Sequence, residues 1–210
     1  MKEIEELSKK YSENAFLRGF ISVIPYVGGG LDILLGDRWN KIYRRRVDNM
    51  LEQFSVDLKN LESKINEQFL NSEDFFDISC KILNESIKTR LDDKRKLYSK
   101  IIRDAISNSY ETIETEEVID IVTSLNEKDL IFIYKIEEFT IESRTETFSG
   151  EKLTNFIEDK NFNINEVVRM LYRLSYLGIL NYDTRKLTLR KYIEFSKNPL
   201  YKLIINYLKE

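Results

Sequence analysis

The sequence predicts a mainly α-helical protein with a helical domain over residues 1–125 and a smaller domain of helices and a β-hairpin over residues 126–210. Glycine and proline, which interrupt helices, are scarce, with 7 and 2 residues in a chain of 210. Apolar residues recur at steps of three and four along most of the chain, as in amphipathic helices. Only the second half also contains short β-branched runs and turn signals.

The stretch 16–39, FLRGFISVIPYVGGGLDILLGDRW, holds most of the glycines, one proline and the single tryptophan. Its uncharged run between Arg18 and Asp32 is shorter than the about 20 residues that a membrane-spanning helix needs. Pro25 and three successive glycines would break a single helix, so we expect two short apolar helices joined by a turn. A nucleotide-binding loop is excluded because no strand precedes the glycines and no Lys-Ser or Lys-Thr pair follows them.

This apolar Pro/Gly hairpin has three remaining interpretations: packing in the core, which we favour, contact with a partner, or contact with a membrane surface. Arg44, Arg45 and Arg46 follow it as a basic run, which is either a solvated helix face or a contact for anionic lipid or phosphate. The side chains that would make a membrane or partner contact are Phe20, Ile24, Tyr26, Val27, Leu31, Leu34, Arg44, Arg45 and Arg46.

Apolar residues from Trp39 to Leu70 form a heptad-like seam and predict one long helix. The seam would pack against helices of the same chain, which is the commoner use, or join two copies in a homo-oligomer. A capping side chain and acidic residues at 71–74 predict a helix that runs to about Lys88. Further helices are expected at about 92–109 and 115–125. The charged outer face of the first of these carries Lys94, Arg95, Lys96, Lys100 and Arg103.

The second half predicts the order helix, strand, helix, helix, hairpin and final helix. Capping residues and glycine mark the helix ends, and β-branched residues mark the strands. The expected elements are a helix capped by Asn126, a strand at 140–148, a helix at 149–159, a helix capped by Asn163 or Asn165 and ended by Gly178, a hairpin of 179–182 and 186–190 around a turn at 183–184, and a helix after Pro199.

This order, with the segment VVRMLYRLSYLGILNYDTRKLTLR, resembles the winged-helix variant of helix-turn-helix proteins over about residues 126–195. The resemblance implies either a DNA-reading helix with a wing on the phosphates or a protein-docking module. Glu166, Asp183 and the near-neutral charge of this half favour the docking module. The side chains that would contact nucleic acid are Arg169, Tyr172, Arg173, Arg185, Lys186, Arg190 and Lys191.

Catalytic chemistry has little support in the sequence. The absence of histidine and the single cysteine, Cys80, exclude Cys–His and Ser–His pairs and zinc sites built on these residues. Cys80 lies in an apolar helical pattern that favours a structural thiol. Adjacent carboxylates such as Asp92 and Asp93 diverge on a helix, and Asp32 and Asp37 serve more simply as helix caps or ion-pair partners than as cation ligands. We predict no catalytic residue, cofactor or metal site.

The segments IPYVGGGLDILLG, WNKIYRRRVDNMLEQF, RLDDKRKLYSKIIRDAI and SLNEKDLIFIYKI resemble a loose group of bacterial proteins that includes the abortive-infection alpha group of phage-resistance proteins. The resemblance implies a role in bacterial phage defence or a mobile element. Within such a system, we expect a non-enzymatic protein-interaction component with a partner from a neighbouring gene. A DNA-binding regulator and a membrane-engaging effector are the alternatives. The charged start MKEIEELSKKYSEN lacks a signal-peptide pattern, so we expect a cytoplasmic protein, with or without membrane association.

Overall fold

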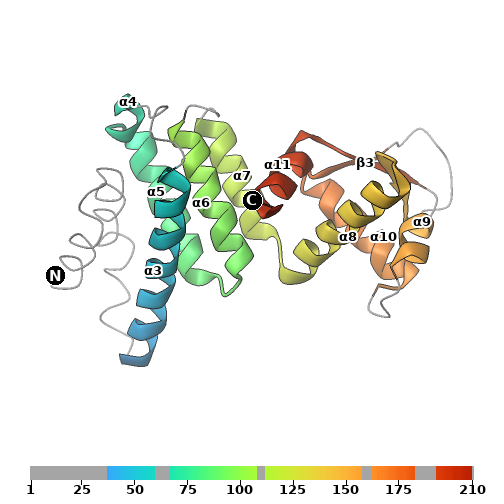
Figure 1. Cartoon of the computed structure of the whole chain (residues 1–210), viewed down its shortest axis with the longest axis horizontal. Coiled ribbons are helices and arrows are strands. Elements are labelled where there is room, and N and C mark those ends of the chain that lie inside the picture. The colour runs from blue at the N-terminus through green and yellow to red at the C-terminus, as the bar shows by residue number, and fades with distance from the viewer. Residues whose placement is uncertain (1–36, 60–66, 108–111, 158–161, 183–192, 210) are drawn as a thin grey trace. The chain divides into compact units, whose positions relative to one another are not determined.

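Helices dominate the computed structural model, which describes residues 37–59, 67–107, 112–157, 162–182 and 193–209 (Figure 1). These residues form nine helices and three short strands, which confirms the predicted mainly helical class. The chain divides between Thr123 and Ser124 into two compact units, called unit 1 and unit 2 below. The predictions for residues 1–36, including the turn at Pro25, lie outside the described residues.

The described part of unit 1 consists of helices joined by short connections. The helices are α3 (Asp37–Lys59), α4 (Glu67–Leu70), α5 (Glu73–Lys88), α6 (Asp92–Ile106) and α7 (Thr112–Ser124). α5 begins and ends where the sequence predicts. Its start is fixed by Ser72, whose hydroxyl accepts a hydrogen bond from the Phe75 N–H at 3.2 Å, and by acidic residues in the first turn.

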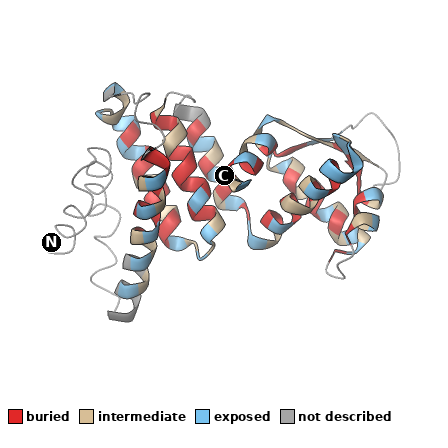
Figure 2. Cartoon of the chain, viewed as in Figure 1, coloured by how far each residue is buried: buried red, intermediate tan, exposed pale blue. Residues whose placement is uncertain are grey.

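Four positions of the apolar seam predicted along the long helix are buried, and buried residues alternate with exposed ones along the helices of unit 1 (Figure 2). Val47, Leu51, Phe54 and Leu58 of α3 are at most 2% exposed, and α3 packs against α5 and α6. Burial of this seam stabilises the unit by about 25 cal/mol for each Å² of apolar surface removed from water. These four positions are therefore occupied by contacts of the same chain and are not free to form a coiled coil with a second copy.

The charged face predicted on α6 is largely buried, which corrects the expectation of an outer face. Lys94, Arg95 and Lys100 are all less than 9% exposed. Lys94 Nζ donates a hydrogen bond to the Thr123 carbonyl oxygen at 2.7 Å, and Arg95 Nη1 donates to the Thr89 carbonyl oxygen at 2.9 Å. Both acceptors lie at helix C-termini, where carbonyl groups lack partners within the helix and favour positive charge. The spacing of residues in the sequence does not show that basic side chains will bond to main-chain carbonyls at the ends of helices.

The described part of unit 2 combines helices with an antiparallel sheet. The elements are α8 (Glu127–Ser143), β1 (Thr147–Ser149), α9 (Gly150–Phe156), α10 (Ile164–Tyr176), β2 (Leu180–Tyr182), β3 (Glu194–Lys197) and α11 (Pro199–Lys209). The strand order is β1-β3-β2. Phe148 of β1 and Tyr182 of β2 both lie opposite Phe195, so the central strand aligns aromatic residues across the sheet.

Local capping fixes helix ends in unit 2, and the predicted cap at Asn126 and helix end at Gly178 are confirmed. Asn126 and Asp129 form a capping box at the start of α8, and the Ser149 hydroxyl caps α9. Asn163, and not Asn165, caps α10. Gly178 follows the end of α10 with a φ of 72°, a conformation that glycine adopts without strain.

One strand prediction is wrong. Residues 140–148 do not form one strand, because α8 continues to Ser143 and only Thr147–Ser149 form β1. The hydroxyls of Thr140 and Ser143 bond to carbonyl oxygens one turn earlier, a pattern that a helix accommodates despite the β-branched composition. The strand predicted at 179–182 is found as β2 (Leu180–Tyr182), which pairs with β3, and burial of Phe195 fixes the register of that pair. The prediction of a second hairpin strand at 186–190 falls on residues that the structure does not describe. Residues 183–192 lie outside the described part.

α11 packs against α8, as the sequence predicts for a last helix after Pro199. Proline occupies the first helical position, where its missing N–H leaves no bond unmade. Asn198 caps the helix by accepting a hydrogen bond from the Tyr201 N–H at 2.9 Å. Tyr201 is fully buried, and its hydroxyl donates to the Ile133 carbonyl oxygen of α8 at 3.0 Å. These contacts attach the last helix to the core of unit 2.

Candidate functional site

α10 carries the side chains that the sequence selects for nucleic-acid contact. Its buried face consists of Val167, Met170, Leu171 and Leu174. Helical periodicity leaves Arg169, Tyr172 and Arg173 on the other side of the helix, where they are exposed or half-buried. The surroundings of these three side chains determine which ligands the surface can accept.

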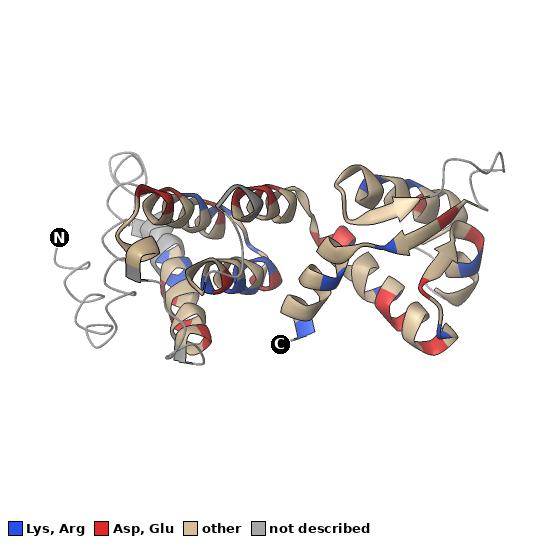
Figure 3. Cartoon of the chain, turned by 90° about the horizontal axis from the view of Figure 1, so that it is seen from above, with Lys and Arg blue, Asp and Glu red and all other residues tan. Residues whose placement is uncertain are grey.

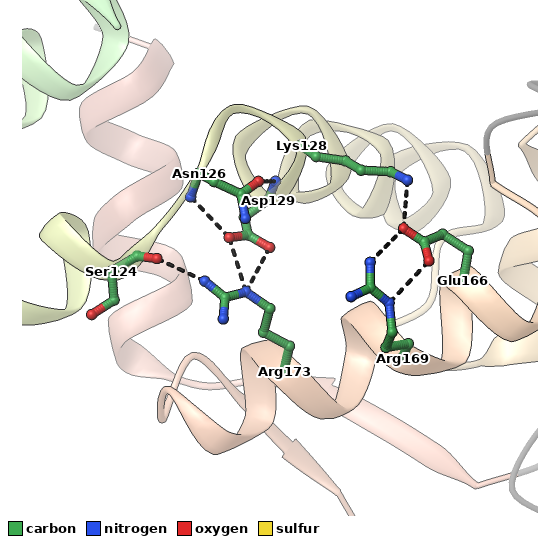
Figure 4. A network of polar contacts seen from close by, with 7 residues as sticks. All are labelled: Ser124, Asn126, Lys128, Asp129, Glu166, Arg169 and Arg173. Atoms are coloured by element: carbon green, nitrogen blue, oxygen red, sulfur yellow. Dashed lines mark hydrogen bonds and ion pairs between the residues drawn. The ribbon is translucent and has the colours of Figure 1, made fainter. Parts of the chain in front are cut away.

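Arg169 is held by a carboxylate of its own helix (Figure 4). Its Nε and Nη2 atoms donate to the two carboxylate oxygens of Glu166 at 2.9 and 2.7 Å. Lys128 of α8 donates to the same carboxylate. Hydrogen bonds from Arg169 first and Lys128 second lower the pKa of the Glu166 carboxyl to about 2. Glu166 is therefore ionised near neutral pH and offsets much of the positive charge that α10 presents.

Arg173 makes a second and more buried pair (Figure 4). Its Nε donates to both carboxylate oxygens of Asp129 at 3.1 Å, and its Nη2 donates to the Ser124 carbonyl oxygen at 2.7 Å. Only 1% of the Asp129 side chain is exposed, and its Oδ2 also accepts the Asn126 N–H at 2.9 Å. One carboxylate thus caps α8 and positions a basic side chain of α10.

An aromatic cluster adjoins the paired arginines on the outer side of α10. Tyr172 packs edge-on against Tyr182 of β2 and Phe195 of β3, with ring centroids 5.7 and 5.6 Å apart. Tyr176 is 92% exposed and Tyr182 43% exposed. Neither Tyr176 nor Tyr182 was among the predicted site residues. The helical spacing of Tyr176 from Arg169 and Tyr172 is a signal that would have found the former.

The remaining predicted site residues divide between described and undescribed parts of the chain. Arg45 is exposed, whereas Arg46 is half-buried and donates to the carbonyl oxygens of Ile87 and Lys88. The residues that lie outside the described side chains are Phe20, Ile24, Tyr26, Val27, Leu31, Leu34, Arg44, Arg185, Lys186, Arg190 and Lys191. Basic and acidic residues are interspersed along the helices of each unit (Figure 3).

The described residues offer no candidate for a metal site or for a membrane-spanning helix. No group of three or more His, Cys, Asp or Glu side chains there is placed to hold a metal ion. No helix in that part of the chain has both the length and the apolar character to cross a membrane.

Cys80 is half-buried, and burial first and the charge of Asp77 second raise the pKa of its thiol, which disfavours the reactive thiolate.

Comparison with known proteins adds no family to this geometry. No protein-family model, curated protein or solved structure matches the chain. The paired arginines and exposed tyrosines of unit 2 are therefore the features that bear on function.

Proposed function

We propose that unit 2 is a winged-helix domain that binds a protein partner through the outer side of α10 and strand β2. The order helix, strand, helix, helix, strand, strand, with β3 between β1 and β2, supports this arrangement. A fold of this kind serves both nucleic-acid and protein ligands, so the side chains on its surface must decide between them.

The observation that carries the proposal is a fully exposed tyrosine beside arginines that already have acidic partners. Tyr176 presents almost its whole side chain to solvent, although it lies on a helix whose other face is well packed. Tyrosine and arginine are enriched at protein interfaces, where an aromatic ring supplies apolar area and a hydroxyl supplies hydrogen bonds. Truncation of a hot-spot residue of this kind lowers the binding free energy by about 2 kcal/mol or more.

A DNA-binding regulator is the second candidate, because 68% of the Arg169 side chain is exposed. DNA contact would require Arg169 and Arg173 to exchange their carboxylates for phosphates or base edges. Glu166 and Asp129 would then stand near the negative backbone, and their repulsion would weaken binding. The protein-docking function needs no such exchange.

The biological setting that we propose is bacterial anti-phage defence or a mobile element, in which the chain acts without catalysis. Support for this setting comes from the resemblance of four sequence segments to such proteins. We expect the partner to be the product of a neighbouring gene. Expression of both genes should lower the plating efficiency of a phage, and Tyr176→Ser should restore plating.

A binding measurement with the purified product of the neighbouring gene tests the docking surface. We expect Tyr176→Ser to weaken the complex at least about tenfold, since loss of an interface anchor costs more than about 1.4 kcal/mol. Ile141→Ser is the matched control, because Ile141 is also strongly exposed, at 63%, but lies at the far end of α8. This control should bind as wild type.

A second measurement separates protein docking from DNA binding. Fluorescence anisotropy with a labelled duplex at low salt should detect no saturable binding by the wild-type protein. Saturable DNA binding that Arg169→Ala with Arg173→Ala abolishes would replace our proposal with the regulator. An equal effect of Tyr176→Ser and Ile141→Ser on the protein complex would also reject the proposed surface.

A further inference from the structure

The turn after α10 separates the two exposed tyrosines of the proposed docking surface. Tyr176 is the last residue of α10, and Tyr182 is the last residue of β2. The Tyr176 side chain is 92% exposed and makes no hydrogen bond or ring contact with the residues that the structure describes. Tyr182 instead packs against Tyr172 and Phe195. The direction of Tyr176 relative to Tyr182 therefore depends on the backbone of the turn between them.

Backbone hydrogen bonds give this turn the pattern of a Schellman motif. The Gly178 N–H donates to the Ser175 carbonyl oxygen at 3.0 Å, and the Ile179 N–H donates to the Leu174 carbonyl oxygen at 2.9 Å. Gly178 has a φ of 72°, and a Cβ at this position would meet nothing within 4 Å, so glycine serves here for its backbone freedom. Because glycine adopts other conformations readily, a further contact is needed to favour this one.

Asn198, which lies between β3 and α11, makes that contact. Its Nδ2 donates a hydrogen bond to the Gly178 carbonyl oxygen. Its Oδ1 accepts the Tyr201 N–H at 2.9 Å and so caps α11. The preceding residue, Lys197, lies opposite Leu180 in the final pair of the β2–β3 ladder. The Asn198 side chain thus extends the attachment between β2 and β3 as far as the turn.

We propose that Asn198 is a positioning residue of the docking surface. Through the Gly178 carbonyl it holds the end of α10 and the start of β2 in the orientation that a protein partner binds. This inference rests on the docking function proposed above. A partner that meets both tyrosines already in place does not have to order the turn on binding, which favours the complex.

Asn198→Ser separates the two hydrogen bonds of this side chain. Serine caps helices about as well as asparagine, so it keeps a cap for the Tyr201 N–H but removes the donor to the Gly178 carbonyl. Asn163→Ser is the matched control, since Asn163 caps α10 through the Glu166 N–H and has no other bond to a described residue. Circular dichroism should show that both variants are folded.

The affinity for the purified product of the neighbouring gene tests the positioning role. A turn that adopts the binding orientation for about a fifth of the time binds about fivefold more weakly, which we expect of Asn198→Ser. Asn163→Ser should stay within about twofold of wild type. Tyr176→Ser combined with Asn198→Ser should lose less than the two separate losses together, because Asn198 acts partly through the placement of Tyr176.

Hydrogen exchange in the free protein tests the same role without the partner. In Asn198→Ser, exchange of the Gly178 and Ile179 amides should quicken about threefold or more, because the turn opens more often. Exchange of the Tyr201 amide should stay as in wild type, since its cap is retained.

The outcomes separate this inference from the docking function. An unchanged complex with Tyr176→Ser would reject the docking function and the positioning role together. A weaker complex with Tyr176→Ser, but equal affinities of Asn198→Ser and Asn163→Ser, would overturn the positioning role alone. Unchanged exchange of the Gly178 and Ile179 amides in Asn198→Ser would also overturn it.

Discussion

Two arginines on α10 face carboxylates in different surroundings. Arg173 pairs with Asp129, which is almost completely buried and also caps α8. Arg169 pairs with Glu166 at the surface, and Lys128 remains as a second partner of that carboxylate. Loss of a partner is costly when the charge left behind is buried, and nearly neutral when water or another cation replaces it.

The first prediction compares Arg173→Ala with Arg169→Ala in urea unfolding. Arg173→Ala should lower the free energy of unfolding by about 1–3 kcal/mol, because Asp129 loses its cationic partner while it stays buried. Arg169→Ala should change it by less than about 0.5 kcal/mol, as is usual for exposed pairs. Equal losses in the two variants would contradict the view that burial distinguishes the pairs.

Features that depend on local backbone contacts were predictable from the sequence, whereas partners that lie far apart in the sequence were not. Asn163 and Gly178 mark the ends of α10 through local backbone bonds and a local φ, so short-range rules suffice. Arg173 and Asp129 are 44 residues apart in sequence. A single sequence gives no signal for such a pair, which is why Arg173 was placed among the candidate nucleic-acid contacts.

At the scale of elements, an ionic cluster attaches α11 to α8 and β3. Glu137 of α8 accepts hydrogen bonds from Lys197 at 2.6 Å, Lys209 at 2.7 Å and the Tyr201 hydroxyl at 3.3 Å. The Lys197 side chain is only 9% exposed, and its ammonium group lies 5.2 Å from the centre of the Tyr201 ring. One carboxylate thus joins three secondary-structure elements.

The second prediction is that Glu137→Gln loosens α11. The variant should lower the free energy of unfolding by about 1–3 kcal/mol, because Lys197 is left buried without its counter-charge while Gln keeps a hydrogen-bond acceptor. Hydrogen exchange of the α11 amides should quicken more than that of the α10 amides. Glu138→Gln is the matched control, since Glu138 is exposed and pairs only with Lys135 among the residues described. Slower or unchanged exchange in α11 would count against this role.

The same cluster should respond to acid. Burial raises the pKa of the Glu137 carboxyl, but hydrogen bonds from Lys197 and Lys209 outweigh burial and leave the pKa below its ordinary value. A lowered native pKa means that the stabilisation is fully present above the unfolded pKa and is lost as pH falls through the native one. The difference in stability between wild type and Glu137→Gln should therefore shrink as the solution is made acidic.

Helices with strong local signals were predicted well, as was the strand that became β2, but the strand predicted at 140–148 was not. α5 has a cap, an acidic first turn and a clear apolar face, and all three features predict the same helix. The segment 140–148 has a β-branched composition, but packing of Phe139 and local hydroxyl bonds extend α8 through Ser143. β2 pairs with β3, where Phe195 is buried, and this strand lies well beyond the nearest turn signal in the sequence. Tertiary packing thus overrides weak strand propensity.

At the scale of the molecule, each unit has its own buried core. In unit 1 the core includes Phe54 and Tyr98, and Tyr98 also bonds through its hydroxyl to Thr123 at 2.9 Å. In unit 2 the core includes Phe148, Phe195 and Tyr201. A unit with a separate core can unfold as a separate cooperative unit.

The last prediction is that residues 124–210 fold when they are expressed alone. Their sheet, the Asp129–Arg173 pair and the Glu137 cluster all lie within that range, so cutting before Ser124 breaks none of these contacts. We expect a helical circular dichroism spectrum and a cooperative thermal transition. Tyr201→Ala in the same fragment should lower the transition by about 10 °C or more, because loss of a buried aromatic side chain costs about 3 kcal/mol or more. A fragment that melts without cooperativity would show that this core needs the preceding residues.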